Sequence, residues 1–126
     1  MNEITVNSCS ELNETLQQKK NEFRKIFILF TGSKDSEGNS WCPDCVKAEP
    51  VVKKTITKYS DQPSSLFVTA FVGARDVWKS AENAFRTSKD YRVRCVPTIL
   101  KYGTSLRLEE NQCADESLLE MLLEEE

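Results

Sequence analysis

The amino-acid sequence predicts an α/β fold in which helices flank a central mixed β-sheet on both faces. Short apolar runs rich in β-forming residues alternate with stretches of helical periodicity, so the elements follow the order β-α-β-α-β-α-β-β-α. The first part of this order contains two β-α-β crossovers, which give parallel strands with helices packed on the sheet. The last two strands form a hairpin, and this antiparallel pair makes the sheet mixed.

We expect one domain over residues 1–126. This length suits a single compact domain and is too short for two ordinary ones. Hydrophobic residues make up 39% of the chain and charged residues 29%, which is typical of a globular protein rather than a disordered one. No linker, internal repeat or low-complexity stretch divides the sequence, apart from the acidic tail at 124–126.

Two strands and a capped helix are predicted in the first third of the chain. Residues 4–6 alternate as a short strand, and Ser8 with Glu11 three residues later makes a capping box that opens a helix. Residues 26–30 are a continuous apolar run, which predicts a strand buried on both faces. A polar loop at 32–40 follows this strand and leads into the next helix.

The rest of the chain predicts one more crossover, a hairpin and a terminal helix. A β-rich run at 66–72 predicts a strand, and a helix is expected at about 79–88. Strands at 98–102 and 105–108 form the hairpin, and Asp115 can cap the last helix. The side chains expected to point inward from the 79–88 helix are Ala81, Ala84 and Phe85.

The composition excludes several classes of function. The chain has no histidine, so catalytic triads with histidine, imidazole base chemistry and zinc sites with a histidine ligand are excluded. With a net charge of −3 and no basic stripe interleaved with aromatic residues, we do not expect nucleic acid as a partner. The four glycines are not spaced as a dinucleotide-binding fingerprint.

The sequence also indicates the cellular compartment in which the protein is expected. The N-terminus is polar, without the apolar core of a signal peptide, and no apolar run approaches the roughly 18 residues that a membrane span needs. We therefore expect a cytoplasmic protein that does not bind membranes, in a compartment where thiols stay reduced. The five cysteines are an odd number, which does not suit a fully paired disulfide framework. Reactive, metal-binding or buried thiols remain as interpretations.

Cys42 and Cys45 are the most informative residues. Two residues separate them at the predicted start of a helix, which brings both sulfurs close enough to bond. The first sulfur then faces the unpaired N–H groups of the helix N-terminus, which favour an anion and so favour a thiolate. Pro43 fits the first helical position, where no N–H is needed. The chemistry that follows is attack of Cys42 on a disulfide and resolution of the mixed disulfide by Cys45.

The surrounding residues make the motif more specific. An aromatic residue, Trp41, precedes the dithiol, Pro50 lies eight residues after Cys42, and Val96-Pro97 enters a later strand. In these features the chain resembles thioredoxin-fold proteins, and more narrowly the fourteen-kilodalton thioredoxin-related proteins, which carry a Trp-Cys-Pro-Asp-Cys motif. The segments that carry the resemblance are 30–35, 40–45, 48–52, 96–98 and 100–103, together with Trp78-Lys79 and Phe85-Arg86.

The resemblance implies a thioredoxin fold and a cytosolic disulfide reductase that contributes to cell redox homeostasis. Cys42 matches the family's nucleophile and Cys45 its resolving thiol, with a redox-active disulfide between them when oxidised. Pro97 matches the cis-proline that faces the dithiol, which would leave the backbone of Val96 able to pair with a substrate strand. No cofactor is bound, and electrons come from NADPH through thioredoxin reductase. The family acts on small disulfides and selected protein thiols.

Asp44 and the long loop suggest a narrower substrate range than that of ordinary thioredoxins. The charged loop at 32–40 leads straight into the dithiol, and Pro43-Asp44 puts a carboxylate beside it. The helix dipole favours Asp44, whereas its charge opposes thiolate formation on its neighbours. Ordinary thioredoxins bury an acid in the preceding strand to accept the proton of the resolving cysteine, and residues 26–30 contain none. Asp44 or water is our hypothesis for that role.

The remaining cysteines are interpreted by position. Cys9 lies on the apolar stripe of the first helix and is expected to be a small buried side chain. Cys113, near the last helix, is expected at the surface. Cys95 stands two residues before Pro97, so it is either a packing residue or a third redox-active thiol that traps Cys42. A zinc site would need four ligands without any histidine, and these cysteines lack the usual spacing.

Taken together, the sequence predicts a monomeric thiol-disulfide oxidoreductase of the cytoplasm that reduces small-molecule, peptide or selected protein disulfides. In this interpretation Trp41 shields the dithiol and contacts the substrate. The alternative is a redox-sensing interaction protein, in which the state of the dithiol switches the binding of a partner and turnover is incidental.

Overall fold

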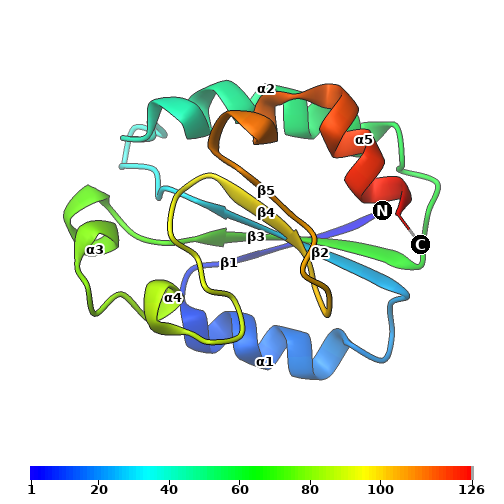
Figure 1. Ribbon diagram of the computed structural model, residues 1–126, viewed down its shortest axis with the longest axis horizontal. Helices are drawn as coiled ribbons and strands as arrows, with labels where there is room; N and C mark the ends of the chain where they lie inside the picture. The colour runs from blue at the N-terminus through cyan, green and yellow to red at the C-terminus, as the bar shows by residue number, and fades with distance from the viewer. Residues whose placement is uncertain (126) are drawn as a thin grey trace.

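The computed structural model describes residues 1–125 and contains a five-stranded mixed β-sheet (Figure 1). The strands lie in the order β1, β3, β2, β4 and β5. Strand β3 pairs in parallel with β1 and β2, whereas β4 pairs antiparallel with β2 and β5. The bounds are Asn2–Val6 for β1, Lys25–Thr31 for β2, Ser65–Phe71 for β3, Thr98–Lys101 for β4 and Arg107–Glu109 for β5.

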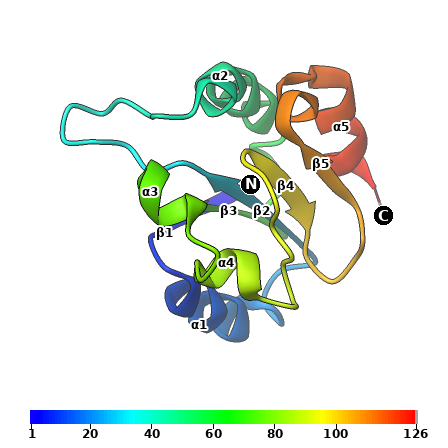
Figure 2. The ribbon, with the colours of Figure 1, turned by 60° about the vertical axis from the view of Figure 1, so that its left-hand side comes forward.

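Helices cover both faces of the sheet (Figures 1 and 2). One face carries α2 (Pro43–Thr57), the 3-10 helix η1 (Glu110–Ala114) and α5 (Glu116–Glu124). The other face carries α1 (Cys9–Lys19), α3 (Arg75–Lys79) and α4 (Ala84–Thr87). This arrangement confirms the predicted fold class.

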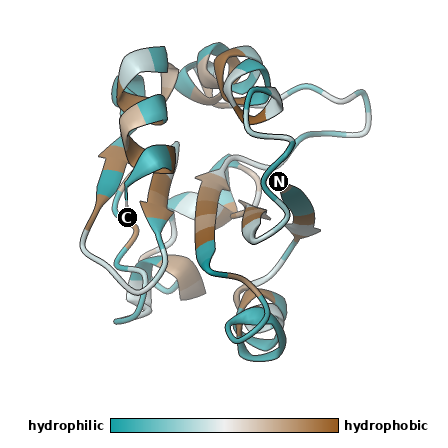
Figure 3. Ribbon diagram, turned by 90° about the vertical axis from the view of Figure 1, so that its right-hand side faces the viewer, coloured by the Kyte–Doolittle hydropathy of each residue, from teal (hydrophilic) through white to brown (hydrophobic). Residues whose placement is uncertain are grey.

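Strand β2 shows why the core has two layers. Successive side chains of a strand point to opposite faces of the sheet. Ile26, Ile28 and Phe30 accordingly pack in the apolar cluster with α1, α3 and α4, whereas Phe27 and Leu29 pack in the cluster with α2 and α5. Figure 3 shows this apolar character concentrated in the strands between the helical layers. The predicted strand at 26–30, buried on both faces, is confirmed.

The predicted helix starts are confirmed at both ends of the chain. The N–H of Glu11 donates to the hydroxyl of Ser8, 3.1 Å away, at the start of α1. The carboxylate of Glu11 accepts from the N–H of Asn7 rather than that of Ser8, one residue further out than in an ideal capping box. At the start of α5, Asp115 accepts from the N–H of Leu118 at 3.2 Å.

The predicted helix at 79–88 is wrong, because this region forms two short helices separated by a turn. The side chain of Asn83 ends the first and starts the second: its amide group donates to Val72 and Val77 carbonyls, and its oxygen caps Phe85. Phe85 is buried as expected, whereas Ala81 and Ala84 are exposed. A side chain bonded across to the end of β3 overrides the helical periodicity of the segment.

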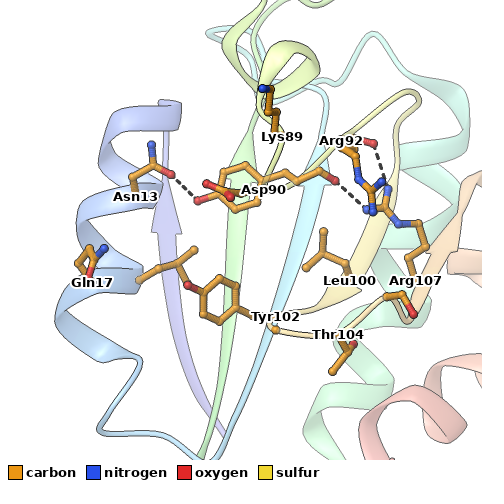
Figure 4. Close-up of a pocket in the computed structure, with 13 residues that line it drawn as sticks. Asn13, Gln17, Lys89, Asp90, Arg92, Leu100, Tyr102, Thr104 and Arg107 are labelled. Carbon is orange, nitrogen blue, oxygen red and sulfur yellow. Dashed lines mark hydrogen bonds between the residues drawn. The ribbon is translucent and has the colours of Figure 1, made fainter.

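The connection from α4 to β4 is fixed at two points. The buried Tyr91 donates its hydroxyl hydrogen to Asn13 on α1, and its ring centroid lies 5.6 Å from that of Phe30. Arg107 donates to the carbonyls of Tyr91 and Arg92, at 2.7 and 3.1 Å (Figure 4). These bonds anchor the chain just before the segment that faces the dithiol.

Candidate active site

Trp41 and the preceding loop form one wall of the site. The indole N–H of Trp41 donates to the carbonyl of Gly73 at 3.0 Å. Gly32 lies against the ring so closely that an added Cβ would come within 2.8 Å of a Trp41 carbon. Within the loop, the Asp35 carboxylate accepts the N–H groups of Glu37 and Asn39. The loop is therefore held by hydrogen bonds within itself. The ring of Trp41 is held by its bond to Gly73 and by its close contact with Gly32.

Cys42 caps helix α2. Its sulfur accepts the N–H of Cys45 at 3.2 Å, and Pro43 occupies the first helical turn, where no N–H is required. The thiol of Cys42 also lies 3.8 Å from the carbonyl oxygen of Val96. The Val96–Pro97 peptide bond is cis, as the resemblance implied. The predicted residues Cys42, Val96 and Pro97 are thus brought together although more than fifty residues separate them in sequence.

Cys45 faces the interior. Both cysteines of the dithiol are 4% exposed and unbonded to each other, and the sulfur of Cys45 accepts the N–H of Gly32 at 3.5 Å. Burial, together with the contact with Cys42, raises the pKa of Cys45 to about 12. The neutral thiol is therefore strongly favoured at this position, and Cys45 needs a proton acceptor before it can act as a nucleophile.

A cavity of about 220 Å³ lies behind Cys45, between the sheet and α2. Thr31, Lys34 and Glu49 line it with Cys45, and Pro97 forms part of the same wall. Lys34 and Glu49 form an ion pair of 2.8 Å, and Lys34 holds the pKa of the Glu49 carboxyl below its ordinary value. This ion pair is not predictable from local sequence patterns, because Lys34 and Glu49 lie fifteen residues apart and meet only in the folded chain.

A groove of about 430 Å³ lies on the opposite side of the dithiol. The predicted site residues that line it are Trp41, Cys42, Pro43, Asp44, Cys95 and Val96. Asp44 therefore lines the Cys42 side, whereas the cavity on the Cys45 side is lined by Glu49. The groove also contains Lys79, Arg86 and Arg94. The first two were named only as part of the family resemblance, and none of the three was predicted to lie at the site. Their basic character is visible in the sequence, but α3 and α4 are needed to bring them to Cys42.

Cys95 is half-buried in the groove wall. Its sulfur lies 3.7 Å from the hydroxyl of Thr98, and burial raises the pKa of its thiol. Cys9 is also half-buried, packs against the core beside α4, and has a raised pKa for the same reason. Cys9 was expected to be a small buried side chain, and this is met only in part, because the side chain is half-buried.

The expected surface position of Cys113 is wrong. Its side chain is 0% exposed, and burial raises the pKa of its thiol to about 12. The thiol lies 3.6 Å from the Pro97 carbonyl and 3.5 Å from that of Leu108. The 3-10 helix η1, which the sequence analysis did not anticipate, turns Cys113 under α5 and against the cis-proline segment.

Within residues 1–125, His, Cys, Asp and Glu side chains form no group of three or more that could hold a metal ion. Among the helices of these residues, none combines the length and apolar character that a membrane crossing requires.

Comparison with known proteins identifies the family. A family model described as the thioredoxin domain of thioredoxin domain-containing protein 17-like proteins matches residues 5–125. The chain belongs to this family. It is 42% identical to human thioredoxin domain-containing protein 17 over 124 residues, which cover 98% of this chain and 96% of the human one. It is also 34% identical over 107 residues to the thioredoxin-like protein Clot of Arabidopsis thaliana, covering 82% and 78% of the two chains.

Solved thioredoxin structures confirm the fold. A reduced thioredoxin of Schistosoma mansoni superposes with a TM-score of 0.62 at 19% identity, covering 97% of this chain and 99% of its own. Oxidised thioredoxin O2 of Arabidopsis thaliana gives a TM-score of 0.56 at 18% identity, with 95% and 93% covered. The chain therefore has the thioredoxin fold, and as a member of the thioredoxin domain-containing protein 17-like family it is a thioredoxin-like redox protein.

Proposed function

We propose that the protein is a disulfide reductase in which Cys42 is the nucleophile and Cys45 the resolving thiol. The observation that carries this proposal is the asymmetry of the pair. Cys42 lines the outer groove and receives the N–H of Cys45 at 3.2 Å, whereas Cys45 lines the inner cavity. One thiol is thus placed for the substrate, with a backbone N–H directed at its sulfur, and the other is kept back for the second step.

The reaction proceeds in two exchanges. The Cys42 thiolate attacks one sulfur of the substrate disulfide, a Cys42–substrate disulfide forms, and the other substrate sulfur leaves as a thiolate that takes up a proton. Cys45 then gives up its proton and attacks the Cys42 sulfur, which releases the second substrate thiol. Two electrons pass to the substrate, and the dithiol becomes a Cys42–Cys45 disulfide.

The proton of Cys45 leaves through the inner cavity. Our sequence hypothesis assigned its acceptance to Asp44 or water. Glu49 is the better candidate, because its carboxylate lines the same cavity as Cys45 and Asp44 does not. The cavity is large enough for water to connect the two groups. The neighbouring Lys34 cation favours the developing Cys45 thiolate.

Trp41, Val96 and Pro97 form the substrate surface in this proposal. The half-buried Trp41 ring offers an apolar contact at one edge of the groove, and Val96 offers a backbone carbonyl 3.8 Å from the Cys42 sulfur. An extended substrate segment can pair with backbone groups at this position. Small-molecule, peptide and selected protein disulfides are the proposed substrates.

The oxidised protein is regenerated by thioredoxin reductase with electrons from NADPH, without a bound cofactor, and it acts as a monomer in the cytoplasm. The test follows NADPH consumption with thioredoxin reductase and cystine, using wild type, Cys42→Ser and, as a control at a half-buried thiol outside the site, Cys9→Ser. Sustained turnover that is lost only in Cys42→Ser supports the proposal. Equal turnover in wild type and Cys42→Ser contradicts it.

Cys95 remains a candidate for a third redox thiol, because it lines the groove together with Cys42. The proposed step is attack of the Cys95 thiolate on Cys42 of the Cys42–Cys45 disulfide, which forms a Cys42–Cys95 disulfide and frees Cys45 as a thiol. No external oxidant is needed once the dithiol is oxidised. Mass spectrometry of the oxidised protein tests this step. A Cys42–Cys45 disulfide without any Cys42–Cys95 disulfide would contradict a redox role for Cys95.

A second candidate function is redox-dependent binding of a protein partner. Two apolar side chains near the dithiol favour it: Val46, which follows Cys45 on α2, is 54% exposed, and Val77 on α3 is 52% exposed. Exposed apolar residues beside a redox centre can bind a partner when the dithiol changes state. Stoichiometric reduction of the protein without continued NADPH consumption would favour this function over the reductase.

A further inference from the structure

The groove beside Cys42 is the first of three adjoining hollows, and cations dominate all three. The groove contains three cations, Lys79, Arg86 and Arg94, and one carboxylate, Asp44. This excess of positive charge contrasts with the net charge of the chain, which is −3. The local potential beside the dithiol is therefore opposite in sign to the charge of the molecule as a whole.

The second hollow, of about 330 Å³, begins where the groove ends. Arg94 lines both, and the other residues of the second hollow are Arg92, Arg107 and Glu109. Glu109 lies 2.7 Å from the guanidinium of Arg94 and 3.9 Å from that of Arg107. One carboxylate between two guanidinium groups neutralises only one of them, and Arg92 adds a third positive charge.

The third hollow, of about 920 Å³, continues the series (Figure 4). It shares Arg92 and Arg107 with the second hollow, and it adds Lys89 and the single carboxylate of Asp90. We call these side chains the cationic track. Its members are Lys79, Arg86, Lys89, Arg92, Arg94 and Arg107, and the acidic residues that line the same hollows are Asp44, Asp90 and Glu109.

Several cations of the track are held in place before any substrate arrives. The guanidinium of Arg86 lies 4.0 Å above the ring of Trp78 and donates to the Trp78 carbonyl at 2.6 Å. Arg94 makes two bonds to Glu109 while its side chain stays 80% exposed. Arg107 is fixed by the carbonyls of Tyr91 and Arg92. Preorganised charges cost little ordering entropy when a ligand binds.

We propose that the preferred substrates are polypeptide disulfides with acidic residues clustered near the reacting cysteine. This inference rests on the proposed reductase function and names the substrate class of that same site. A small disulfide occupies the groove beside Cys42, whereas a polypeptide whose cysteine reaches Cys42 extends over the neighbouring hollows. Carboxylates on that segment meet the cationic track, which speeds encounter and fixes the register of the segment. The thiol-disulfide exchange itself, with its two electrons from the dithiol, is unchanged.

The test uses three synthetic peptides of equal length, each with one internal disulfide and with Glu, Gln or Lys as the flanking residues. The full-length protein is reduced beforehand and mixed with each peptide, and thiol release is followed in a single turnover. The rate constant is expected to be about tenfold higher for the Glu peptide than for the Lys peptide at low salt, with the Gln peptide between them. The difference should largely disappear at about 0.5 M salt.

Charge-removing variants locate the effect. Arg92→Gln and Lys89→Gln should each lower the ratio of Glu-peptide to Gln-peptide rates by a factor of about 1.5, because each removes one cation of the track. The matched control is Lys20→Gln, which removes an exposed cation at the end of α1 outside the three hollows and should leave that ratio unchanged. Because both rates in each ratio are measured with the same variant, a lower amount of folded protein changes both equally and leaves the ratio unaffected.

Each outcome decides the proposal. Equal rates for all three peptides would overturn the substrate class and leave the reductase function standing. Reduction of no disulfide, cystine included, would overturn both. A single-stranded oligonucleotide that inhibits reduction of the Gln peptide, without any rank order among the peptides, would assign the track to nucleic acid and overturn the proposal. The predicted rank order, its loss in salt and the lower ratios in the two variants would support it.

Discussion

The two cysteines of the dithiol have different surroundings although only two residues separate them. Cys42 lies at the N-terminus of α2 beside an open groove with two tryptophans and three cations. Cys45 lies one turn into the helix beside a cavity that contains the Lys34–Glu49 ion pair. The sulfur of Cys42 accepts the backbone N–H of Cys45, whereas burial raises the pKa of the Cys45 thiol and so favours its neutral form.

This difference shows how one helix start can supply two kinds of thiol. In the proposed reaction the groove side presents a sulfur to the substrate, and the cavity side keeps a second sulfur protonated until the mixed disulfide forms. Gly32 contacts residues on both sides of the dithiol. Its N–H donates to the sulfur of Cys45, and its Cα lies close to the ring of Trp41. Variants that act on one side should therefore change one step of the reaction.

The largest effect is expected from the cysteines themselves. Cys42→Ser should lower disulfide reduction by about three orders of magnitude or more, because the thiol that attacks the substrate disulfide in the proposed reaction is removed. Cys45→Ser should keep the first exchange and accumulate the Cys42–substrate disulfide. Intact-mass spectrometry after mixing with a small disulfide distinguishes the two variants. A stable adduct in Cys42→Ser, with none in Cys45→Ser, would reverse the assigned roles.

Removal of the carboxylate on the cavity side is expected to have the next largest effect. Glu49→Gln should slow release of the second product about tenfold to a hundredfold, because Cys45 loses its proton acceptor while Cys42 is untouched. Asp44→Asn is the matched control on the groove side and should change this step less. Stopped-flow measurements of each step between pH 6 and 9 test this. A resolution rate in Glu49→Gln that follows the wild-type pH profile would show that Glu49 takes no part.

Gly32→Ala should disturb the groove side first. The added Cβ would lie 2.8 Å from the Trp41 ring, so the ring must shift, at an expected cost of about 1–3 kcal/mol in the free energy of unfolding. Urea unfolding of the single variant, of Trp41→Leu and of the double variant measures the coupling. A smaller side chain at 41 should relieve most of the loss. Strictly additive losses would mean that the clash is absent.

The smallest effect concerns stability at high pH. Burial raises the pKa of Cys45 and of Cys113 from 9.0 to about 12, so the unfolded chain releases these protons at lower pH than the folded one. Their contribution to stability is fully present below about pH 9 and is lost progressively as the pH rises toward 12. In the oxidised protein Cys45 has no thiol to titrate, so its pH-dependent contribution to stability is absent. Urea unfolding of reduced and oxidised protein between pH 8 and 10.5 should show the steeper fall in the reduced form, and parallel curves would refute the assignment.

The sequence predicted what depends on neighbours along the chain. The buried strand β2, the cap at Ser8 and the cysteines at the start of α2 all follow from local patterns. The break between α3 and α4 does not, because Asn83 bonds to Val72 eleven residues earlier. The Lys34–Glu49 pair and the cationic track were missed for the same reason. Each joins residues that are far apart in sequence, and a stripe of charge is visible only after the elements pack.

Because Cys113 is buried, the reactivity of its thiol can be used to measure local unfolding of η1 and α5. A thiol with 0% exposure, held against the carbonyls of Pro97 and Leu108, reacts with an alkylating reagent only when η1 and α5 detach from the sheet. Its labelling rate under native conditions therefore measures the free energy of that local unfolding. Since Pro97 also lines the wall of the cavity behind Cys45, a change in this rate between the reduced and oxidised protein would reveal whether the redox state of the dithiol loosens the packing of η1 and α5 against the sheet.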